Sequence, residues 1–168
     1  MKKIIIVLFL FVCIYLIKNN KEEFIIPSNA IRFRVIANSN TFEDQATKME
    51  IKTNIENILK TDLISVNNKT EADKILTRKI PEIETMLKGY KMDYNLNYGD
   101  NYFPEKSYKG VKYPSGTYES LVVTLGSGKG ENWWCVLYPP LCMMDNKESN
   151  LNNVEYASFI EELFNKYL

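Results

Sequence analysis

The segment IRFRVIANSNTFEDQATKMEIKTNIENILK, residues 31–60, decides the fold, because the spacing of its apolar residues changes part-way along it. Over residues 31–37 the apolar residues alternate with two arginines, and this period of two predicts a strand with one buried face. Thr41 and Asp44 then have the spacing of a helix-capping box. Residues 46–60 repeat apolar side chains at helical spacing, so they predict an amphipathic helix that ends at about residue 60.

A second helix follows in the sequence. Thr70 and Asp73 form another capping pair, and the apolar residues after them recur at helical spacing until Gly89. Pro81 lies inside this run and removes one backbone hydrogen bond. The sequence therefore predicts a kink at Pro81, or a break between two shorter helices.

The rest of the chain is mostly extended. Three segments have the alternation or the composition of strands: residues 90–98, 117–125 and 133–138. Residues 101–116 are rich in Pro, Gly and aromatic side chains, which predicts an irregular loop packed on the domain, and residues 154–168 predict an amphipathic helix. This order predicts an α+β domain with a small, mostly antiparallel sheet and helices packed on one face.

The first residues have the layout of a targeting segment. Two lysines precede the uncharged residues 4–17, and a third lysine follows them. As a helix this run would be ~21 Å long, against a bilayer core of ~30 Å. Residues 1–20 are therefore predicted to be a signal peptide or a signal-anchor helix, followed by a linker over residues 21–30. Residues 31–168 would then form one extracytoplasmic domain.

The composition removes several classes of function. The chain has 21 basic and 21 acidic residues, so it lacks the excess of positive charge that nucleic-acid binding requires. It contains no histidine, which removes catalytic triads, Cys-His nucleophiles and His-bound zinc. Only two cysteines lie outside the apolar N-terminal run, too few for a four-thiolate zinc site. We expect no metal, no cofactor and no enzymatic activity.

The densest motif is NWWCVLYPPLC, residues 132–142. Adjacent strand residues point to opposite faces, so Trp133 and Trp134 cannot both be buried on one side of a sheet. One of them is expected to face a cleft or a partner, unless it packs under the aromatic loop before Gly116. Cys135 and Cys142 flank a proline turn and are expected to form a disulfide outside the cytoplasm. A catalytic cysteine is the alternative, although no histidine is present to activate it.

Aromatic residues dominate the energetics of protein interfaces, so this motif is also the candidate for partner binding. The residues that we assign to it are Asn132, Trp133, Trp134, Tyr138, Pro139 and Pro140.

Three segments of the chain resemble motifs of one known family: IRFRVIANSNTFEDQATKMEIK, FPEKSYKGVKYPSGTYESL and NWWCVLYPPLC. In this order, over residues 31–142, they resemble the stage II sporulation protein R family of endospore-forming bacteria. The first segment contains what we take as a family-motif loop, formed by Asn38, Ser39, Asp44 and Gln45.

The resemblance implies a secreted signalling protein, made in the forespore and exported into the space between the forespore and mother-cell membranes. There it is expected to activate a membrane-embedded aspartic protease of the mother cell. That protease would process the pro-form of an early mother-cell sigma factor. Residues 4–17 are the part of the chain expected to enter a membrane.

An alternative from a different class is a cell-wall hydrolase with two catalytic carboxylates beside an aromatic cleft. The candidate pairs are Glu119 with Asp100 and Glu119 with Glu131. A peptidoglycan-binding module without activity is a further alternative.

Overall fold

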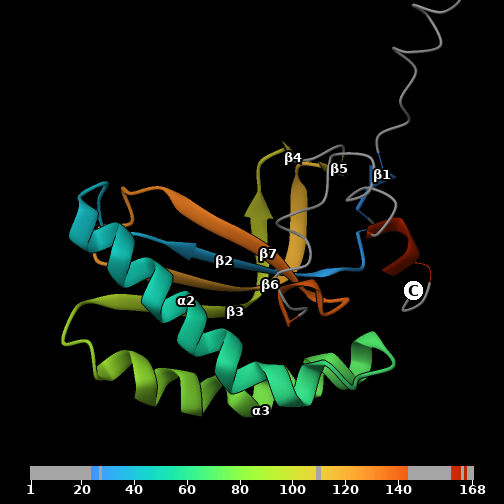
Figure 1. Ribbon diagram of the computed structural model, residues 1–168, viewed down its shortest axis with the longest axis horizontal. Coiled ribbons are helices and arrows are strands. Elements are labelled where there is room, and N and C mark those ends of the chain that lie inside the picture. Colours follow the sequence, from blue (N-terminus) through green and yellow to red (C-terminus); the bar gives the residue numbers. More distant parts are fainter. Residues whose placement is uncertain (1–23, 27, 109–110, 144–159, 164, 166–168) are drawn as a thin grey trace, which may run out of the picture.

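The computed structural model describes residues 24–26, 28–108, 111–143, 160–163 and 165. Two long helices lie beside each other against the larger of two sheets, and the short strands of the smaller sheet lie at the upper right in Figure 1. The predicted α+β class is confirmed.

The larger sheet has the strand order β3-β6-β2-β7. Its strands are β2 (Ile31–Ile36), β3 (Tyr94–Phe103), β6 (Gly116–Leu125) and β7 (Asn132–Tyr138). β3 is antiparallel to β6, β2 is parallel to β6, and β7 is antiparallel to β2. The sheet is therefore mostly antiparallel, as predicted, with β2 in its interior.

The alternation in β2 assigns its side chains to two faces. Ile31, Phe33 and Val35 are fully buried against the helices, while Arg32 and Arg34 lie on the opposite face. The helical side of this core consists of the apolar stripes of α2 (Phe42–Leu63) and α3 (Lys69–Lys88). Burial of such stripes is the main source of helix stability in a protein.

α2 matches its prediction at the start and extends further at the end. Thr41 is the N-cap, and its hydroxyl oxygen accepts a hydrogen bond from the Asp44 N–H at 3.3 Å. The helix continues three residues beyond the predicted end, to Leu63. This residue is buried four positions after the buried Leu59, so the apolar stripe extends by one more turn.

α3 begins at a different cap from the predicted one, and of the two alternatives at Pro81, a kink or a break, the break does not occur. Its N-cap is Asn68, whose side-chain oxygen accepts a hydrogen bond from the Glu71 N–H at 2.9 Å, so the Thr70 and Asp73 pair is not the cap. The helix is also continuous through Pro81. Buried apolar residues on both sides of the proline pack into the same core, and this burial outweighs the loss of one backbone hydrogen bond.

The predicted strand over residues 90–98 was wrong at both ends. Residues 89–93 form the turn out of α3, with Lys91 at a φ of 51°, and strand pairing begins only at Tyr94. The pairing then continues to Phe103 because β6 offers a partner residue along the whole length. The alternation of apolar and polar residues in residues 90–98 does not show where the neighbouring strand β6 begins or ends.

Residues 101–116 are not an irregular loop. They contain the end of β3, then β4 (Lys106–Tyr108) and β5 (Val111–Tyr113). β1 (Phe24–Ile25) pairs parallel to β5, and β4 pairs antiparallel to it, which makes the smaller sheet. Residues 24–25, predicted as linker, are therefore part of the folded domain.

The smaller sheet packs on the face of the larger sheet opposite the helices. Ile26 and Val111 share a buried cluster with Val136 of β7 and with Ile160 and Leu163. Residues 160–163 and 165 are helical, and the remainder of the predicted helix over residues 154–168 lies outside the described residues.

The predicted signal segment, residues 1–20, also lies outside the described ranges. Within those ranges, no helix combines the length and the apolar character needed to cross a bilayer.

Candidate functional site

The two tryptophans of β7 lie on opposite faces of the larger sheet, as predicted. Trp133 is on the helix side, where its ring meets Phe33 edge-on at 5.4 Å between centroids and lies 4.7 Å from Lys52 Nζ. Trp134 is in register with Arg34 on the other face, and its ring meets Phe103 edge-on at 5.4 Å. The sequence left open whether the second tryptophan packs under the aromatic segment before Gly116 or faces a cleft or partner. Trp134 packs against Phe103 of that segment and yet remains half-buried, so part of its side chain is accessible.

Arg32 is at the centre of this aromatic group and is only 2% exposed. Its guanidinium carbon lies 4.1 Å from the centre of the Phe103 ring, 4.7 Å from that of Tyr118 and 5.3 Å from that of Trp134. Ring faces carry negative potential and attract cations in this range of distances. Burial lowers the pKa of Arg32 to about 10, which still leaves it charged at neutral pH.

Arg34 adds a second charge on the same face. Its guanidinium carbon lies 4.7 Å from the Phe103 ring centre, and burial lowers its pKa as well. Its Nε is buried and has no hydrogen-bond partner in the part of the chain that the structure describes. Two arginines that neighbour each other on one face of β2 thus hold positive charge against the aromatic rings.

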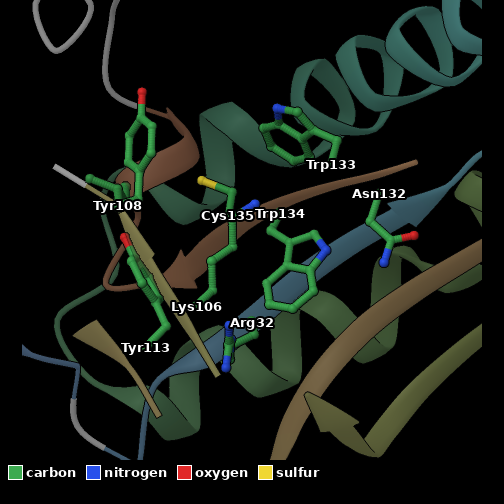
Figure 2. A pocket seen from close by; sticks show the side chains of 9 residues that line it. Arg32, Lys106, Tyr108, Tyr113, Asn132, Trp133, Trp134 and Cys135 are labelled. Carbon is green, nitrogen blue, oxygen red and sulfur yellow. The ribbon is translucent and has the colours of Figure 1, made fainter. Parts of the chain in front are cut away.

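A pocket of about 360 Å³ opens between this face and the smaller sheet (Figure 2). Its lining residues are Arg32, Lys106, Tyr108, Tyr113, Asn132, Trp133, Trp134, Cys135 and Leu141. Lys106 places its Nζ 5.1 Å from the Trp134 ring centre. No carboxylate is among these lining residues, so the pocket combines positive charge with aromatic walls and suits an anionic or aromatic group.

The predicted partner-binding residues separate into two groups. Asn132, Trp133 and Trp134 line the pocket, whereas Tyr138 is fully buried and the two prolines after it are buried as well. Tyr138, Pro139 and Pro140 are buried and are not among the residues that line the pocket, so they have a structural role here. Partner binding by the first three stays a prediction.

The structure contains the predicted disulfide between Cys135 and Cys142. The two Cα atoms lie 5.9 Å apart, within the usual range for a disulfide. Cys142 belongs to a short 3₁₀ helix, η1 (Leu141–Met143), that follows the two prolines. The bridge fixes this turn beside the pocket, which Leu141 and Cys135 line.

The predicted family-motif loop forms a hydrogen-bonded network at the start of α2. Asp44 accepts hydrogen bonds from Ser39 Oγ at 2.5 Å and from Asn38 Nδ2 at 2.9 Å, and these bonds lower the pKa of its carboxyl. Gln45 Nε2 donates to the Ser39 carbonyl at 2.8 Å, while Gln45 Oε1 accepts from Lys48 Nζ at 2.6 Å. The four motif residues therefore bind one another and shape the connection from β2 to α2.

The same loop is held against the glycine-rich loop of residues 126–131. Asn38 Oδ1 accepts from the Ser127 N–H at 2.9 Å, and the Gly130 N–H donates to the Ala37 carbonyl at 2.9 Å. A Cβ at Gly130 would overlap the backbone carbonyl of Ser39, so only glycine allows this close approach. A strand follows this loop, whereas a helix follows the glycine-rich loop of a phosphate-binding P-loop.

The carboxylates proposed for a hydrolase do not meet at the pocket. Glu119 and Asp100 are paired across β6 and β3, and Glu119 Oε2 forms an ion pair with Lys69 Nζ of α3 at 2.8 Å. That pair places Glu119 on the helix side of the sheet, whereas the pocket is on the other side. Glu131 precedes β7 at the far end of the sheet, ~20 Å along the strands at ~3.3 Å per residue, beyond the ~9.5 Å limit for paired glycosidase carboxylates. The two-carboxylate arrangement beside an aromatic cleft is therefore wrong.

Several residues of the pocket were missed from the sequence. Arg32, Lys106, Tyr108 and Tyr113 come from three strands that lie far from the tryptophans in the sequence. A usable signal was present, because the arginines of β2 alternate with apolar residues and therefore had to lie together on the non-core face. What the sequence did not show was that the smaller sheet would cover this face.

Comparison with known proteins supports the family resemblance that the order of the three motifs indicates. Residues 27–148 match the model of the family described as stage II sporulation protein R. The chain belongs to the stage II sporulation protein R family. It is 38% identical over 134 residues to "Stage II sporulation protein R" of Bacillus subtilis (strain 168), a match that covers 76% of this chain and 60% of that relative.

The chain thus aligns with about 60% of the length of this relative. No solved structure matches the chain.

Proposed function

We propose that the chain is an exported sporulation signalling protein that binds and activates a membrane-embedded aspartic protease of the mother cell. The activated protease would then process the pro-form of an early mother-cell sigma factor. Membership of the stage II sporulation protein R family supports this proposal. In the structure, the observation that carries it is the cationic and aromatic pocket around Trp134.

The composition of this pocket is that of a binding surface. Tryptophan, tyrosine and arginine are the residues most often found at the energetic centre of protein interfaces. Here Trp134, Tyr113 and Arg32 come from three different strands and converge on one concavity. Their rings and guanidinium are ordered by packing in the free domain, so little conformational entropy would be lost when a partner binds. The proposed activation needs no chemistry from this chain.

The proposed location follows from the N-terminal segment. Residues 1–20 would direct the chain out of the forespore, and residues 4–17 would lie in the membrane during or after export. The domain would then meet the protease in the space between the two membranes. The disulfide is consistent with this site, because disulfides persist in oxidising compartments.

Reconstitution in a bacterial host that does not sporulate tests the proposal. The full chain, the protease and the precursor are produced together, and cleavage of the precursor is followed by immunoblotting. Trp134→Ala should reduce cleavage by about tenfold or more, the effect expected for a central interface aromatic. Phe42→Ala is the matched control, because Phe42 is 84% exposed on α2 and its loss also removes one exposed aromatic ring.

Two measurements make the outcome decisive. Circular dichroism of each variant shows whether the domain remains folded, since Trp134 also packs on Phe103. A folded Trp134→Ala chain that triggers normal cleavage would refute the assignment of this pocket to the protease. Cleavage that occurs without the chain at all would refute activation itself.

A further inference from the structure

Among the described residues, the cations in and beside the pocket have no carboxylate partner. Arg32, Arg34 and Lys106 all lie within 6.0 Å of the Trp134 ring centre. None of the ion pairs among the described residues includes any of these three cations. Glu105, next to Lys106 in the chain, instead forms an ion pair with Lys112 at 3.2 Å.

We infer that this pocket binds the carboxylate of an aspartate or glutamate side chain in an extended segment of the protein partner. The inference rests on the proposed function and names the chemistry by which that partner is recognised. Charge complementarity carries it, because a carboxylate would supply the negative charge that the described surroundings of the pocket lack.

The placement of the cations makes the pocket selective for charge. Arg32 and Arg34 sit among aromatic rings and are screened from water, so their field inside the pocket is stronger than that of exposed cations. Lys106 is exposed at the rim and can move to contact a ligand. A neutral amide of the same shape would be attracted to these charges only through its dipole, so glutamate should be strongly preferred over glutamine.

The shape of the pocket favours a peptide over a membrane surface. Binding to anionic lipid headgroups relies on clusters of four or more exposed basic residues. Of the three cations here, only Lys106 is exposed. The volume of about 360 Å³ is instead at the lower end of the ~300–1,000 Å³ range of concave ligand sites and suits one acidic side chain and part of its neighbour.

A titration with matched peptides tests the inference. The full chain is kept in neutral dodecyl maltoside micelles, and the two blocked tetrapeptides Gly-Phe-Glu-Gly and Gly-Phe-Gln-Gly are added separately. The indole N–H signal of Trp134 reports binding by NMR, and it can be assigned with Trp133→Phe because the chain has two tryptophans. We expect saturable binding of the Glu peptide that is about tenfold tighter than that of the Gln peptide and weakens with added salt.

Charge variants provide the matched controls. Lys106→Glu should weaken binding of the Glu peptide by about tenfold and leave the Gln peptide nearly unaffected. Lys129→Ala removes an exposed lysine from the loop of residues 126–131, outside the pocket lining, and should change neither. Equal binding of the two peptides, or no saturable binding of either, would overturn the inference.

Other ligands and the cleavage assay separate the remaining outcomes. Inorganic phosphate that shifts the Trp134 signal as strongly as the Glu peptide, or phosphatidylglycerol vesicles that bind through Lys106, would overturn the peptide assignment. Equal binding of both peptides, combined with loss of cleavage in Trp134→Ala, would overturn this inference and leave the proposed function standing. Preference for Glu together with loss of precursor cleavage in Lys106→Glu would support both.

Discussion

Replacing Arg32 by methionine should remove the buried charge of the pocket without destabilising the domain. The side chain is 2% exposed, so its charge has lost nearly all of its hydration. Methionine retains an unbranched, flexible stem of similar reach and can fill the space between Phe103 and Tyr118. The question is whether the buried charge raises or lowers the free energy of unfolding.

The magnitude follows from two opposing effects. Burial lowers the pKa of Arg32 from 12.5 to about 10, and at ~1.4 kcal/mol per pKa unit this disfavours the charged folded state by about 3 kcal/mol. Desolvated contacts with aromatic rings favour the charge by ~2 kcal/mol. Below pH 10 the side chain is charged in both the folded and the unfolded state, so the net cost of about 1 kcal/mol applies in full at neutral pH.

Arg32→Met should therefore be as stable as the original chain, or up to about 1 kcal/mol more stable. Arg32→Ala removes the stem as well and should be ~3 kcal/mol less stable than the Met variant, as for other large-to-small changes at buried sites. Both variants should lose the preference for the Glu peptide, because both lack the buried cation.

The assay is urea unfolding of the full chain in neutral detergent micelles, followed by far-ultraviolet circular dichroism. Arg34→Met is the control, since Arg34 is half-buried on the same face and its replacement should change the free energy of unfolding by less. If Arg32→Met lost more than about 1 kcal/mol, as Arg32→Ala is expected to, the charge itself would be holding the aromatic rings together. That result would refute a net cost of the buried charge at Arg32.

Three further predictions concern the loops around the site. Gly130→Ala should lower the free energy of unfolding by ~2 kcal/mol, because its Cβ would overlap the Ser39 carbonyl, while Gly116→Ala, with ordinary contacts to Tyr118, should cost less in the same urea titration. The double variant Cys135→Ser, Cys142→Ser should lose ~2.5 kcal/mol for an eight-residue loop, and a reductant should destabilise the original chain but not this variant. Asp44 has a lowered pKa, so its stabilising effect is present above pH ~4 and is lost as the pH falls through its folded-state pKa. The stability difference between the original chain and Asp44→Asn should therefore shrink in acid, and an unchanged difference at pH 3 would count against this assignment.

The local elements were largely predictable from the sequence because their causes are local. The alternation in residues 31–36 made β2 amphipathic, and Thr41 capped α2 where the spacing placed it. The adjacent tryptophans had to face opposite sides of any strand that contained them. Errors arose where a distant partner decided the outcome, as in β3, whose length is set by pairing with β6.

The candidate site was predictable only in part for the same reason. Trp134 and the cysteine pair could be selected from one short motif, because residues close in the chain share a strand and a turn. The cations of the pocket could not be assigned in this way, since β2 and β4 contribute them from positions far apart in the sequence.

The sequence by itself determined the class of the fold, the family and the absence of histidine chemistry. It also predicted the export segment. These follow from composition, periodicity and motif order, which need no knowledge of distant contacts. Only the tertiary structure decided that a second sheet would cover the arginine face and enclose a charged pocket with aromatic walls. Long-range strand pairing and the burial of Val111 and Val136 against each other fix that arrangement, and neither is written in any local pattern.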